Sequence, residues 1–522
     1  MEKKKTNYFI GIDFGEKYSS VAIYKGSGPE ILKGNSDDYA IPSYVFFTDD
    51  EIVEGEIAKD LSKDNPGNAI YDSKFMLGRK FDDPVFQERM KKWPFKVISS
   101  INGEPFIEVK FQNKNQYFSP EDITSLILKR LKKMADEYLS TNIENVMIAV
   151  PADWRYDYRR IGITRSAAQK VGLNAVNFVY DPIAVAIAYK IKEKYKTGSV
   201  ALVFDFGGNA LKASLLQLSD GDLDFEILSS VRKDIGGEDF DNNLSEYIAN
   251  IFNDKRNIDL HQNYRSMFLL NSECEKTKKI LSNKQDAILA KAQIINNLDL
   301  KQKIKRREFE KLNSSLFDKI LEPVYDALTE ACLKSEDIDV VLLAGGTSKI
   351  PKVGEILGNT FKGKVISNGI DPEQAIVFGA VMRAKDLFEE KPKNNDDDDV
   401  PFVKEPTNQL KHSIGVKTGK SKMNFIFRKG QELPANSKPF RYRAMAINQT
   451  RLRYKIYIGE NQDTNKNEYI GEFIVDVNAT EGEKVMIEAR FEVDENGTIT
   501  VVTTDPSGQK SKTTIKSEKL FN

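Results

Sequence analysis

The sequence repeats one strand-turn-strand pattern, and this repeat constrains the fold more than any other feature. The two turns read Gly-Ile-Asp-Phe-Gly at Gly11–Gly15 and Phe-Asp-Phe-Gly-Gly at Phe204–Gly208. Each follows an apolar run and leads into a second β-rich stretch, Tyr18–Tyr24 in one case and Leu211–Leu218 in the other. Because a supersecondary unit that occurs twice indicates related halves, we predict two similar lobes that each contribute one turn.

Both turns contain residues that suit phosphate and metal binding. Glycine allows the backbone N–H groups of a turn to approach an anion closely, and an aspartate beside the turn can hold a divalent cation. Asp13 and Asp205 take this position, next to Gly15 in the first turn and to Gly207 and Gly208 in the second. We therefore predict two facing phosphate loops that bind a nucleotide.

A third glycine turn, Leu342–Ser348, follows the apolar run Val340–Leu343. A strand, paired glycines and a helix start can bring the backbone against a ligand, here the adenosine or α-phosphate side of a nucleotide. Taken alone, a strand followed by Gly345 and Gly346 is more often a plain turn. Its place in series with the two Asp-Phe-Gly turns favours a ligand-binding role.

Length and charge limit the class of protein. A chain of 522 residues exceeds a single core, so we expect several domains. Its 77 Lys and Arg residues balance 78 Asp and Glu residues, so charge gives no reason to expect nucleic acid or a membrane as a partner. No segment is long and apolar enough to cross a bilayer, and Met1–Lys5 precedes a strand without a signal-type apolar stretch. We therefore expect a cytoplasmic protein, or a nuclear one.

The cysteines and histidines argue against several kinds of site. Cys274 and Cys332 lie far apart and lack CxxC neighbours, so we expect no disulfide framework and two buried, inert thiols. His261 and His412 are also isolated, which argues against a histidine-based zinc site and against a Ser-His-Asp triad.

The pattern of elements divides the chain into 1–388, 389–411 and 412–522. Strands and helices alternate in 1–388, which predicts an α/β architecture. The segment 389–411 is charged, contains Asp396–Asp399 and lacks apolar anchors, so we interpret it as an acidic linker. Residues 412–522 contain short alternating stretches between turn signals, which predict a small antiparallel β-sandwich.

Two helix starts can be read from capping residues. Ser119–Asp122 has the capping-box pattern, with Pro120 at the first helical position. Gly236–Asp239 introduces a second helix with an apolar face.

Further motifs resemble those of the 70-kDa heat-shock chaperones of the DnaK type. In the first part they are Gly11–Gly15, Lys74–Asp83, Ala149–Ala152, Asp181–Tyr189, Gly236–Asp241, Arg307–Leu312, Leu321–Val324 and Ala344–Pro351. In the last part they are Ser413–Val416, Gly471–Phe473 and Phe491–Gly497. The resemblance implies an actin-like, two-lobed ATPase domain followed by a peptide-binding β-sandwich.

The resemblance also implies ATP or ADP with Mg²⁺ as ligands. In the family two aspartates orient a hydrated Mg²⁺, and by motif these are Asp13 and Asp205. The catalytic positions fall on Lys74, Asp181 and Asp205. The residues that couple nucleotide state to domain movement would be Pro151, Arg159 and Asp181.

By motif, the nucleotide would be held by residues from six separate places in the chain. They are Gly15, Gly207, Gly208, Gly237, Glu275, Lys278, Lys279, Ser282, Gly345, Gly346, Thr347, Lys349 and Glu373. Lys278 and Lys279 could equally belong to an exposed helix face.

The departures from the family pattern gather at the phosphates. Glu16 and Lys17 replace two threonines, and Asn209, Ala210 and Lys212 replace a glycine, a threonine and an aspartate. A carboxylate beside a γ-phosphate repels it. Loss of one positioned polar group at such a site lowers the rate by about 10²–10³. We therefore expect retained nucleotide binding with weak or absent hydrolysis.

Other departures concern the coupling residues and the end of the chain. Asp181 stands where the family has a glutamate, and Lys349 where it has an arginine. The family continues into a helical lid after the sandwich, whereas this sequence stops at Asn522, so we expect a lidless member.

Three functions remain open from the sequence. The favoured one is a weakly hydrolysing chaperone or co-chaperone, similar to the Ssz-type members, that acts with a J-domain partner on unfolded or nascent polypeptides, with the ribosome as a candidate location. The alternative is an ordinary ATP-hydrolysing, peptide-binding chaperone. A sugar-kinase-like enzyme on the same fold is a remote third.

Overall fold

The structure is a computed structural model that describes most of the chain in two compact units. The first unit contains Met1–Arg155 and Arg159–Asn395, and the second contains Asp396–Asn522. The described residues are 8–25, 28–35, 38–155, 157–219, 225–362, 364–366, 369–389, 410, 412–419, 421–429, 431, 433–437, 439–444, 446–477, 484–494 and 497–516. Most of the expected linker 389–411 therefore lies outside the described residues.

The first lobe of the first unit is built on a mixed sheet. In order, its strands are β12 (Ala175–Tyr180), β11 (Asn145–Val150), β1 (Phe9–Phe14), β2 (Tyr18–Lys25) and β3 (Gly28–Ile31), with β4 (Ile41–Pro42) beside β2. The central strand β1 pairs in parallel with β11 and antiparallel with β2. Ile10, Ile12 and Phe14 of β1 are all buried, as expected of a strand in the middle of a covered sheet.

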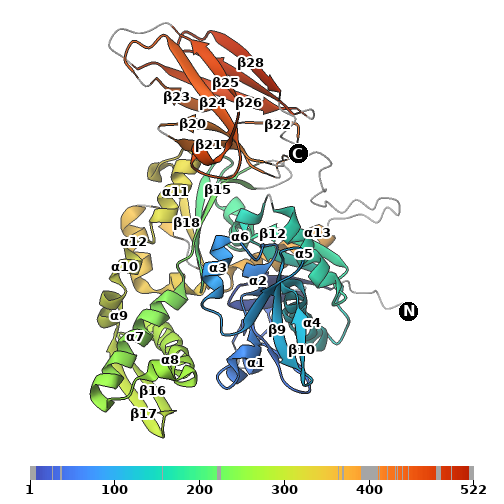
Figure 1. The fold of residues 1–522 in the computed structure, drawn as a ribbon, viewed down its shortest axis with the longest axis vertical. Helices are drawn as coiled ribbons and strands as arrows, with labels where there is room; N and C mark the ends of the chain where they lie inside the picture. Colours follow the sequence, from blue (N-terminus) through green and yellow to red (C-terminus); the bar gives the residue numbers. More distant parts are fainter. Residues whose placement is uncertain are drawn as a thin grey trace. The chain divides into compact units, whose positions relative to one another are not determined.

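The second lobe repeats this topology. Its strands are β15 (Phe225–Lys233), β14 (Leu211–Leu218), β13 (Val200–Phe206), β18 (Val340–Ala344) and β19 (Val365–Ile366). Here β13 pairs antiparallel with β14 and in parallel with β18, as β1 does with β2 and β11. The structure therefore confirms the duplicated unit that the sequence predicts, and the two halves lie side by side (Figure 1).

The two Asp-Phe-Gly turns are equivalent in register. Phe14 pairs with Ser19 at the first turn, and Phe206 pairs with Leu211 at the second. Each turn therefore joins two antiparallel strands at the same relative position in its lobe.

The register also decides what lies beside each aspartate. Asp13 on β1 lies opposite Ser20 on β2, whereas Asp205 on β13 lies opposite Lys212 on β14. The duplicated hairpin thus places a long cationic side chain next to the second aspartate and a short hydroxyl next to the first.

Two apolar helices join the sheets of the two lobes. They are α6 (Asp181–Ala188) and α13 (Ala375–Glu389), which pack against each other and, in the case of α13, against β1. Gly379 of α13 lies so close to the backbone of Ala184 that a Cβ there would overlap it. This close contact fixes α6, and with it Asp181 at the first position of that helix, over the ends of the central strands.

Smaller elements extend each lobe. The first carries β5 (Val45–Phe47), β6 (Ile52–Glu54), β7 (Ala69–Ile70), β8 (Lys96–Ser99), β9 (Pro105–Phe111), β10 (Lys114–Phe118), α1 (Glu56–Leu61), α2 (Ser73–Met76), α3 (Pro84–Met90), α4 (Pro120–Leu139) and α5 (Tyr158–Gln169). The second carries α7 (Gly237–Arg256), α8 (Tyr264–Asn283), β16 (Asp286–Ile295), β17 (Leu298–Lys305), α9 (Arg306–Leu312), α10 (Ser314–Phe317), α11 (Glu322–Glu330) and α12 (Pro351–Thr360).

Both helix starts expected from the sequence are confirmed. Ser119 Oγ accepts a hydrogen bond from Asp122 N at 3.1 Å, and Asp122 Oδ2 accepts one from Ser119 N at 3.0 Å, which completes the capping box of α4. Helix α7 begins at Gly237, directly after Gly236.

The second unit is an antiparallel β-sandwich, as predicted. Within the described residues one sheet contains β21 (Lys422–Phe427), β20 (Ile414–Thr418), β24 (Arg451–Ile458) and β25 (Glu468–Asp476). The other contains β22 (Ala435–Asn436), β23 (Phe440–Arg443), β26 (Met486–Val493), β27 (Thr498–Thr504) and β28 (Lys510–Lys516). The fully buried ring of Phe473 lies 5.1 Å from Tyr454 and 5.7 Å from Phe491 between ring centroids.

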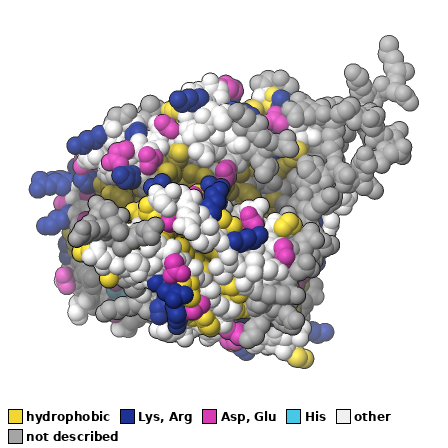
Figure 2. All heavy atoms as spheres, turned by 90° about the horizontal axis from the view of Figure 1, so that it is seen from above, with side chains coloured by type: hydrophobic (Ala, Val, Ile, Leu, Met, Phe, Trp, Pro, Cys, Tyr) yellow, Lys and Arg dark blue, Asp and Glu magenta, His cyan; other side chains and the backbone are white. Residues whose placement is uncertain are grey.

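Surface charge and the two cysteines complete the description. On the face shown in Figure 2, Lys and Arg side chains are interspersed with Asp and Glu side chains, as the net charge of -1 leads one to expect. No helix in the described part of the chain combines the length and apolarity needed to span a bilayer.

Burial raises the pKa of the Cys274 thiol. Cys332 is exposed, so the expectation of two buried thiols was wrong; it follows α11 in a left-handed conformation where the chain turns at the surface.

We predict that Phe473→Ala destabilises the sandwich by about 3–5 kcal/mol, because it removes a large buried ring from a close-packed core. Hydrogen-deuterium exchange of peptides from β24 to β27 should become faster, while exchange in the first unit stays the same. Met486→Ala, at a position that is 46% exposed, is the matched control and should change exchange little. Unchanged exchange in Phe473→Ala would contradict this description of the core.

Candidate functional site

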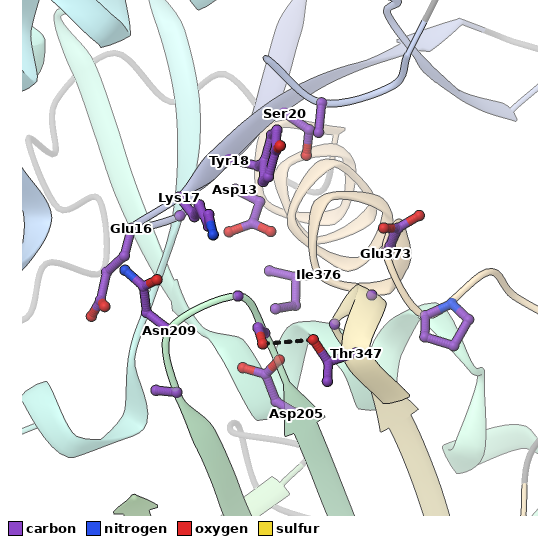
Figure 3. A pocket seen from close by; sticks show the side chains of 18 of the residues that line it. Asp13, Glu16, Lys17, Tyr18, Ser20, Asp205, Asn209, Thr347, Glu373 and Ile376 are labelled. Carbon is purple, nitrogen blue, oxygen red and sulfur yellow. Dashed lines mark hydrogen bonds between the residues drawn. The ribbon is translucent and has the colours of Figure 1, made fainter. Parts of the chain in front are cut away.

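A cavity of about 330 Å³ lies between the two lobes of the first unit. Its walls come from the turns after β1 and β13, the start of α6, the helix α8 and the loop before α13. This volume is typical of sites for small molecules. Both Asp-Phe-Gly turns and the third glycine turn face this one cavity, and Figure 3 shows Asp13 and Asp205 on opposite sides of it.

The structure brings most of the predicted site residues together. The cavity is lined by Asp13, Gly15, Lys74, Pro151, Asp181, Asp205, Gly207, Gly208, Glu275, Lys278, Lys279, Ser282, Gly345, Gly346, Thr347 and Glu373. Its lining does not include Gly237, Lys349 or Arg159.

Gly237 and Lys349 support the lining from behind. Gly237 N donates to the carbonyl oxygen of Gly207 at 3.0 Å, which holds the second turn. Lys349 Nζ lies 3.0 Å from Asp371 Oδ2 and 3.1 Å from Glu373 Oε2, and both acidic residues face the cavity.

Arg159 lies apart from the other predicted residues. It is exposed on α5, and its Nη2 donates to Glu104 Oε1 at 2.5 Å. The coupling role assigned to Pro151, Arg159 and Asp181 therefore stays a prediction.

Lys212 lines the cavity beside the two Asp-Phe-Gly turns, where the sequence predicts the phosphates of a nucleotide, and this part is called the phosphate end. Its side chain is 16% exposed, and its Nζ donates to Asp181 Oδ2 at 2.8 Å and to Asp205 Oδ2 at 3.1 Å. Burial opposes the charge of Lys212, but the two carboxylates outweigh burial and hold its pKa above the usual value. The cluster therefore contains a permanent internal cation.

Asp13 and Asp181 belong to the same charge cluster. Burial, and after it the charge of Asp181, raises the pKa of Asp13. Burial also opposes ionisation of Asp181, but Lys212 and Lys74 outweigh it and lower the pKa of that carboxyl. Asp181 Oδ1 is buried and accepts no hydrogen bond from the described residues, which leaves it available to a ligand or water.

Lys74 places a second ammonium group beside the first turn. It lies in α2, is buried, and donates from Nζ to the carbonyl oxygen of Phe14 at 2.5 Å. Lys74 lines the cavity, and its Nζ lies 5.6 Å from the centre of the Phe14 ring.

Glu16 is neutralised by a partner from the other lobe. Arg232 on β15 binds its carboxylate in a bidentate manner, with Nη1 2.7 Å from Oε1 and Nη2 3.2 Å from Oε2. Burial would raise the pKa of Glu16, but Arg232 lowers it to about 2. Figure 3 shows Glu16 at the side of the cavity, away from Asp13 and Asp205. The repulsion of a phosphate that the sequence predicts is therefore largely offset by Arg232.

Lys17 and Asn209 each reach from one lobe to the other. A Cβ on Gly208 would lie 2.8 Å from Lys17 Cδ, so the lysine stem passes directly over the second turn. Asn209 Nδ2 donates to Asp72 Oδ1 of the first lobe at 3.1 Å. These side chains take space that threonine and glycine would leave open.

The opposite end of the cavity is held by a network around Glu275. Tyr18 OH donates to Glu275 Oε1 at 2.6 Å, and Lys59 Nζ lies 2.8 Å from Tyr18 OH and 3.1 Å from Glu275 Oε2. Burial alone would raise the pKa of Glu275, but Lys59 and further lysines lower it. The network links α1 and β2 of the first lobe to α8 of the second.

For Lys278 and Lys279 the sequence left two interpretations open, nucleotide binding and an exposed helix face. The structure separates the two lysines. Lys278 is buried, and its Nζ donates to the carbonyl oxygen of Gly237 at 2.7 Å and to Asp241 Oδ2 at 2.5 Å, so an exposed face is wrong for it. The side chain of Lys279 is 55% exposed and faces the cavity from the rim.

The third turn requires its glycines. Gly345 has φ 75, and a Cβ there would overlap the carbonyl oxygen of Phe206. A Cβ on Gly346 would overlap the carboxylate of Glu373. Thr347 Oγ1 donates to the carbonyl oxygen of Gly207 at 2.8 Å, as drawn in Figure 3. The second and third turns are thus joined along the edge of the cavity.

The side chains at the phosphate end do not fit a hydrated Mg²⁺ between the aspartates. Asp205 Oδ2 already accepts from Lys212, so a divalent cation there would meet an ammonium group at close range. Among the described residues, no group of three or more His, Cys, Asp and Glu side chains is arranged to hold a metal ion. The metal role of Asp13 and Asp205 stays a prediction from the resemblance alone.

Several functional residues were missed by sequence reasoning. Tyr18 and Asp241 lie within or next to quoted motifs, so a wider reading of those motifs could have found them. Lys59 and Arg232 lie outside every motif, in an ordinary helix and an ordinary strand, and no sequence signal marks them.

Duplicated lobes around facing glycine turns define the class of actin-like, two-lobed nucleotide-binding proteins. The chain belongs to the Hsp70 family, because the family model described as Hsp70 protein matches residues 9–521. Its resemblance to 70-kDa heat-shock chaperones is thereby confirmed, and the chain is an Hsp70-type chaperone.

Curated relatives agree with the family match. Heat shock cognate 70 kDa protein 3 of Dictyostelium discoideum is 34% identical over 516 residues, which cover 98% of this chain and 80% of that protein. A ribosome-associated molecular chaperone of Saccharomyces cerevisiae is 32% identical over 509 residues, which cover 97% of this chain and 81% of that protein. The heat shock 70 kDa protein of Neurospora crassa is 31% identical over 513 residues, with 98% and 78% covered.

We predict that Arg232→Met destabilises the first unit by about 1–3 kcal/mol, because it leaves the Glu16 carboxylate buried without its partner. Trp93 and Trp154, the only tryptophans, both lie in this unit, so urea unfolding followed by tryptophan fluorescence reports on it. The double variant Glu16→Gln with Arg232→Met should lose less stability than the single variant.

The Glu16–Arg232 pair should also make the free energy of unfolding depend on pH. The pKa of Glu16 is lowered from 4.5 to about 2 in the folded protein. The stabilisation of the fold by the Glu16–Arg232 pair is therefore present above pH 4.5, the pKa in the unfolded chain, and is lost as the pH falls toward 2. The difference in free energy of unfolding between wild type and Arg232→Met should become smaller over that pH range. Equal stability of the two proteins at neutral pH would show that the pair contributes nothing.

Proposed function

We propose that this Hsp70-family chaperone binds ATP or ADP, hydrolyses ATP weakly or not at all, and assists polypeptide folding with a J-domain partner in the cytoplasm. The observation that carries the proposal is the position of the Lys212 ammonium between Asp181 and Asp205. We assign nucleotide binding to residues 1–388 and polypeptide binding to residues 412–522, joined by the acidic segment 389–411.

Retained nucleotide binding is supported by the shape of the cavity. The three glycine turns meet at one cavity, where Gly345 and Gly346 allow close approach to a ligand. At the other end, Glu275 and Lys278 are fixed by hydrogen bonds from both lobes.

Weak hydrolysis is supported by the chemistry of the second turn. Phosphoryl transfer depends on groups that position the attacking water and offset charge on the γ-oxygens. Ala210 has no hydroxyl to offer, and the Lys212 ammonium, bound to Asp181 Oδ2 and Asp205 Oδ2, stands where the family has an aspartate that helps to orient water. Each lost group costs about 10²–10³ in rate.

The ribosome is part of the proposal because of the name of a similar protein. Among the similar proteins, one from Saccharomyces cerevisiae is named a ribosome-associated molecular chaperone. We propose nascent polypeptides as clients on this ground, with the sandwich as the polypeptide-binding unit.

Single-turnover ATP hydrolysis, measured with and without a J-domain protein of the same organism, tests the proposal. We expect stimulation of less than about tenfold, because the groups that organise water are missing. Calorimetry on the same preparation should detect nucleotide binding. Stimulation well above that level would instead support an ordinary ATP-hydrolysing chaperone.

A gain-of-function variant provides the matched control. Lys212→Asp with Ala210→Thr restores a carboxylate and a hydroxyl while it leaves the Glu16–Arg232 pair intact, and should raise turnover by about 10² if the second turn limits the rate. An unchanged rate in a folded double variant would show that the lobes, and not this turn, have lost the chemistry.

A further inference from the structure

We propose that the ammonium of Lys212 takes the place of a divalent cation, so that the site binds the phosphates of ATP or ADP without Mg²⁺. The inference rests on the proposed nucleotide binding and concerns the charge that offsets the phosphates. It is carried by the position of Lys212, by the charge balance of the cluster and by the donors that remain open to a ligand.

The backbone fixes Lys212 at this position. Lys212 lies directly opposite Asp205 in the antiparallel pair of β13 and β14. Asp181 approaches from the start of α6, which is held by the close contact of Gly379 with Ala184. The ammonium is thus held between two carboxylates that come from separate, rigid elements.

Lys212 offsets negative charge in this cluster, as a bound divalent cation would otherwise do. The cluster contains the carboxylates of Asp13, Asp181 and Asp205 and the ammonium groups of Lys74 and Lys212. Without Lys212, three carboxylates would face one ammonium, which leaves two negative charges, the amount that one divalent cation neutralises. With Lys212 a single negative charge remains, so the attraction for a further dication is much weaker.

Lys212 has a donor left for a ligand. An ammonium group has three N–H donors, and two are used by Asp181 and Asp205. Among the described residues the third has no partner, and the side chain lines the cavity. A phosphate oxygen there would accept a charge-assisted hydrogen bond, which is among the stronger hydrogen bonds in proteins.

Two more lysines reach the same end of the cavity. Lys17 passes over Gly208 of the second turn, and its Nζ is 3.8 Å from Glu238, too long for a strong bond. Lys74 lies beside the first turn. Phosphates between the two turns would therefore meet ammonium groups from both lobes, all of which belong to the protein.

Calorimetric titration of the wild-type full chain with ADP and with ATP tests this inference, in MgCl₂ and in EDTA at equal ionic strength. We expect the dissociation constants in the two buffers to differ by less than about tenfold. Binding that is tighter in MgCl₂ by tenfold or more overturns the inference and leaves the proposed nucleotide binding in place. Absence of binding in both buffers overturns the proposed nucleotide binding itself.

Variants at Lys212 locate the effect. Lys212→Met keeps most of the stem and removes the charge, and should weaken binding in EDTA by about tenfold or more, with recovery in MgCl₂. Lys212→Asp should make binding dependent on MgCl₂. Lys133→Asp makes the same change of charge on the exposed face of α4 and should bind like wild type. If Lys212→Met binds in EDTA as tightly as wild type, Lys212 does not act as the cation. Should Lys212→Asp fail to fold, the wild-type and Lys212→Met titrations decide the question.

Discussion

The two hydrogen bonds from Lys212 to Asp181 and Asp205 are the interaction on which the phosphate end of this site depends. Three buried or half-buried carboxylates in one place would repel each other strongly without a cation among them. The hairpin register supplies that cation from the neighbouring strand. The result is a cleft with the lobes, turns and helices of the Hsp70 family but with a different charge arrangement where phosphates and metal would lie.

Glu16 and Asn209, two residues that depart from the family pattern, each form a set with a partner from the other lobe. Glu16 brings a negative charge to the first turn, and Arg232 of the opposite lobe binds it in a bidentate manner. Asn209, in the second turn, is bonded to Asp72 of the first lobe. Each set adds a contact between the two lobes beside the turns. The substitutions therefore change the chemistry of the cleft while Glu16 and Lys212 keep oppositely charged partners, which is why the frame of the fold can persist around them.

The repeated turns made the fold and the general place of the site predictable, because glycine and aspartate at fixed positions of a duplicated unit have few alternatives. The partner of Glu16 was not predictable, since Arg232 is distant in sequence and has no motif around it. Lys278 could not be assigned because helical spacing does not tell a buried lysine from an exposed one when its partner, Asp241, lies on another helix. Cys332 was misjudged since exposure at the end of α11 depends on the local turn.

A crystal structure of the full chain with ADP and Mn²⁺ tests the central claim most directly, because Mn²⁺ is located by its anomalous signal. The account predicts ADP in the cavity, Lys212 Nζ still within hydrogen-bond distance of Asp181 and Asp205, and no Mn²⁺ beside Asp13 and Asp205. A Mn²⁺ ion between those two aspartates, with the Lys212 side chain moved away from them, would contradict it.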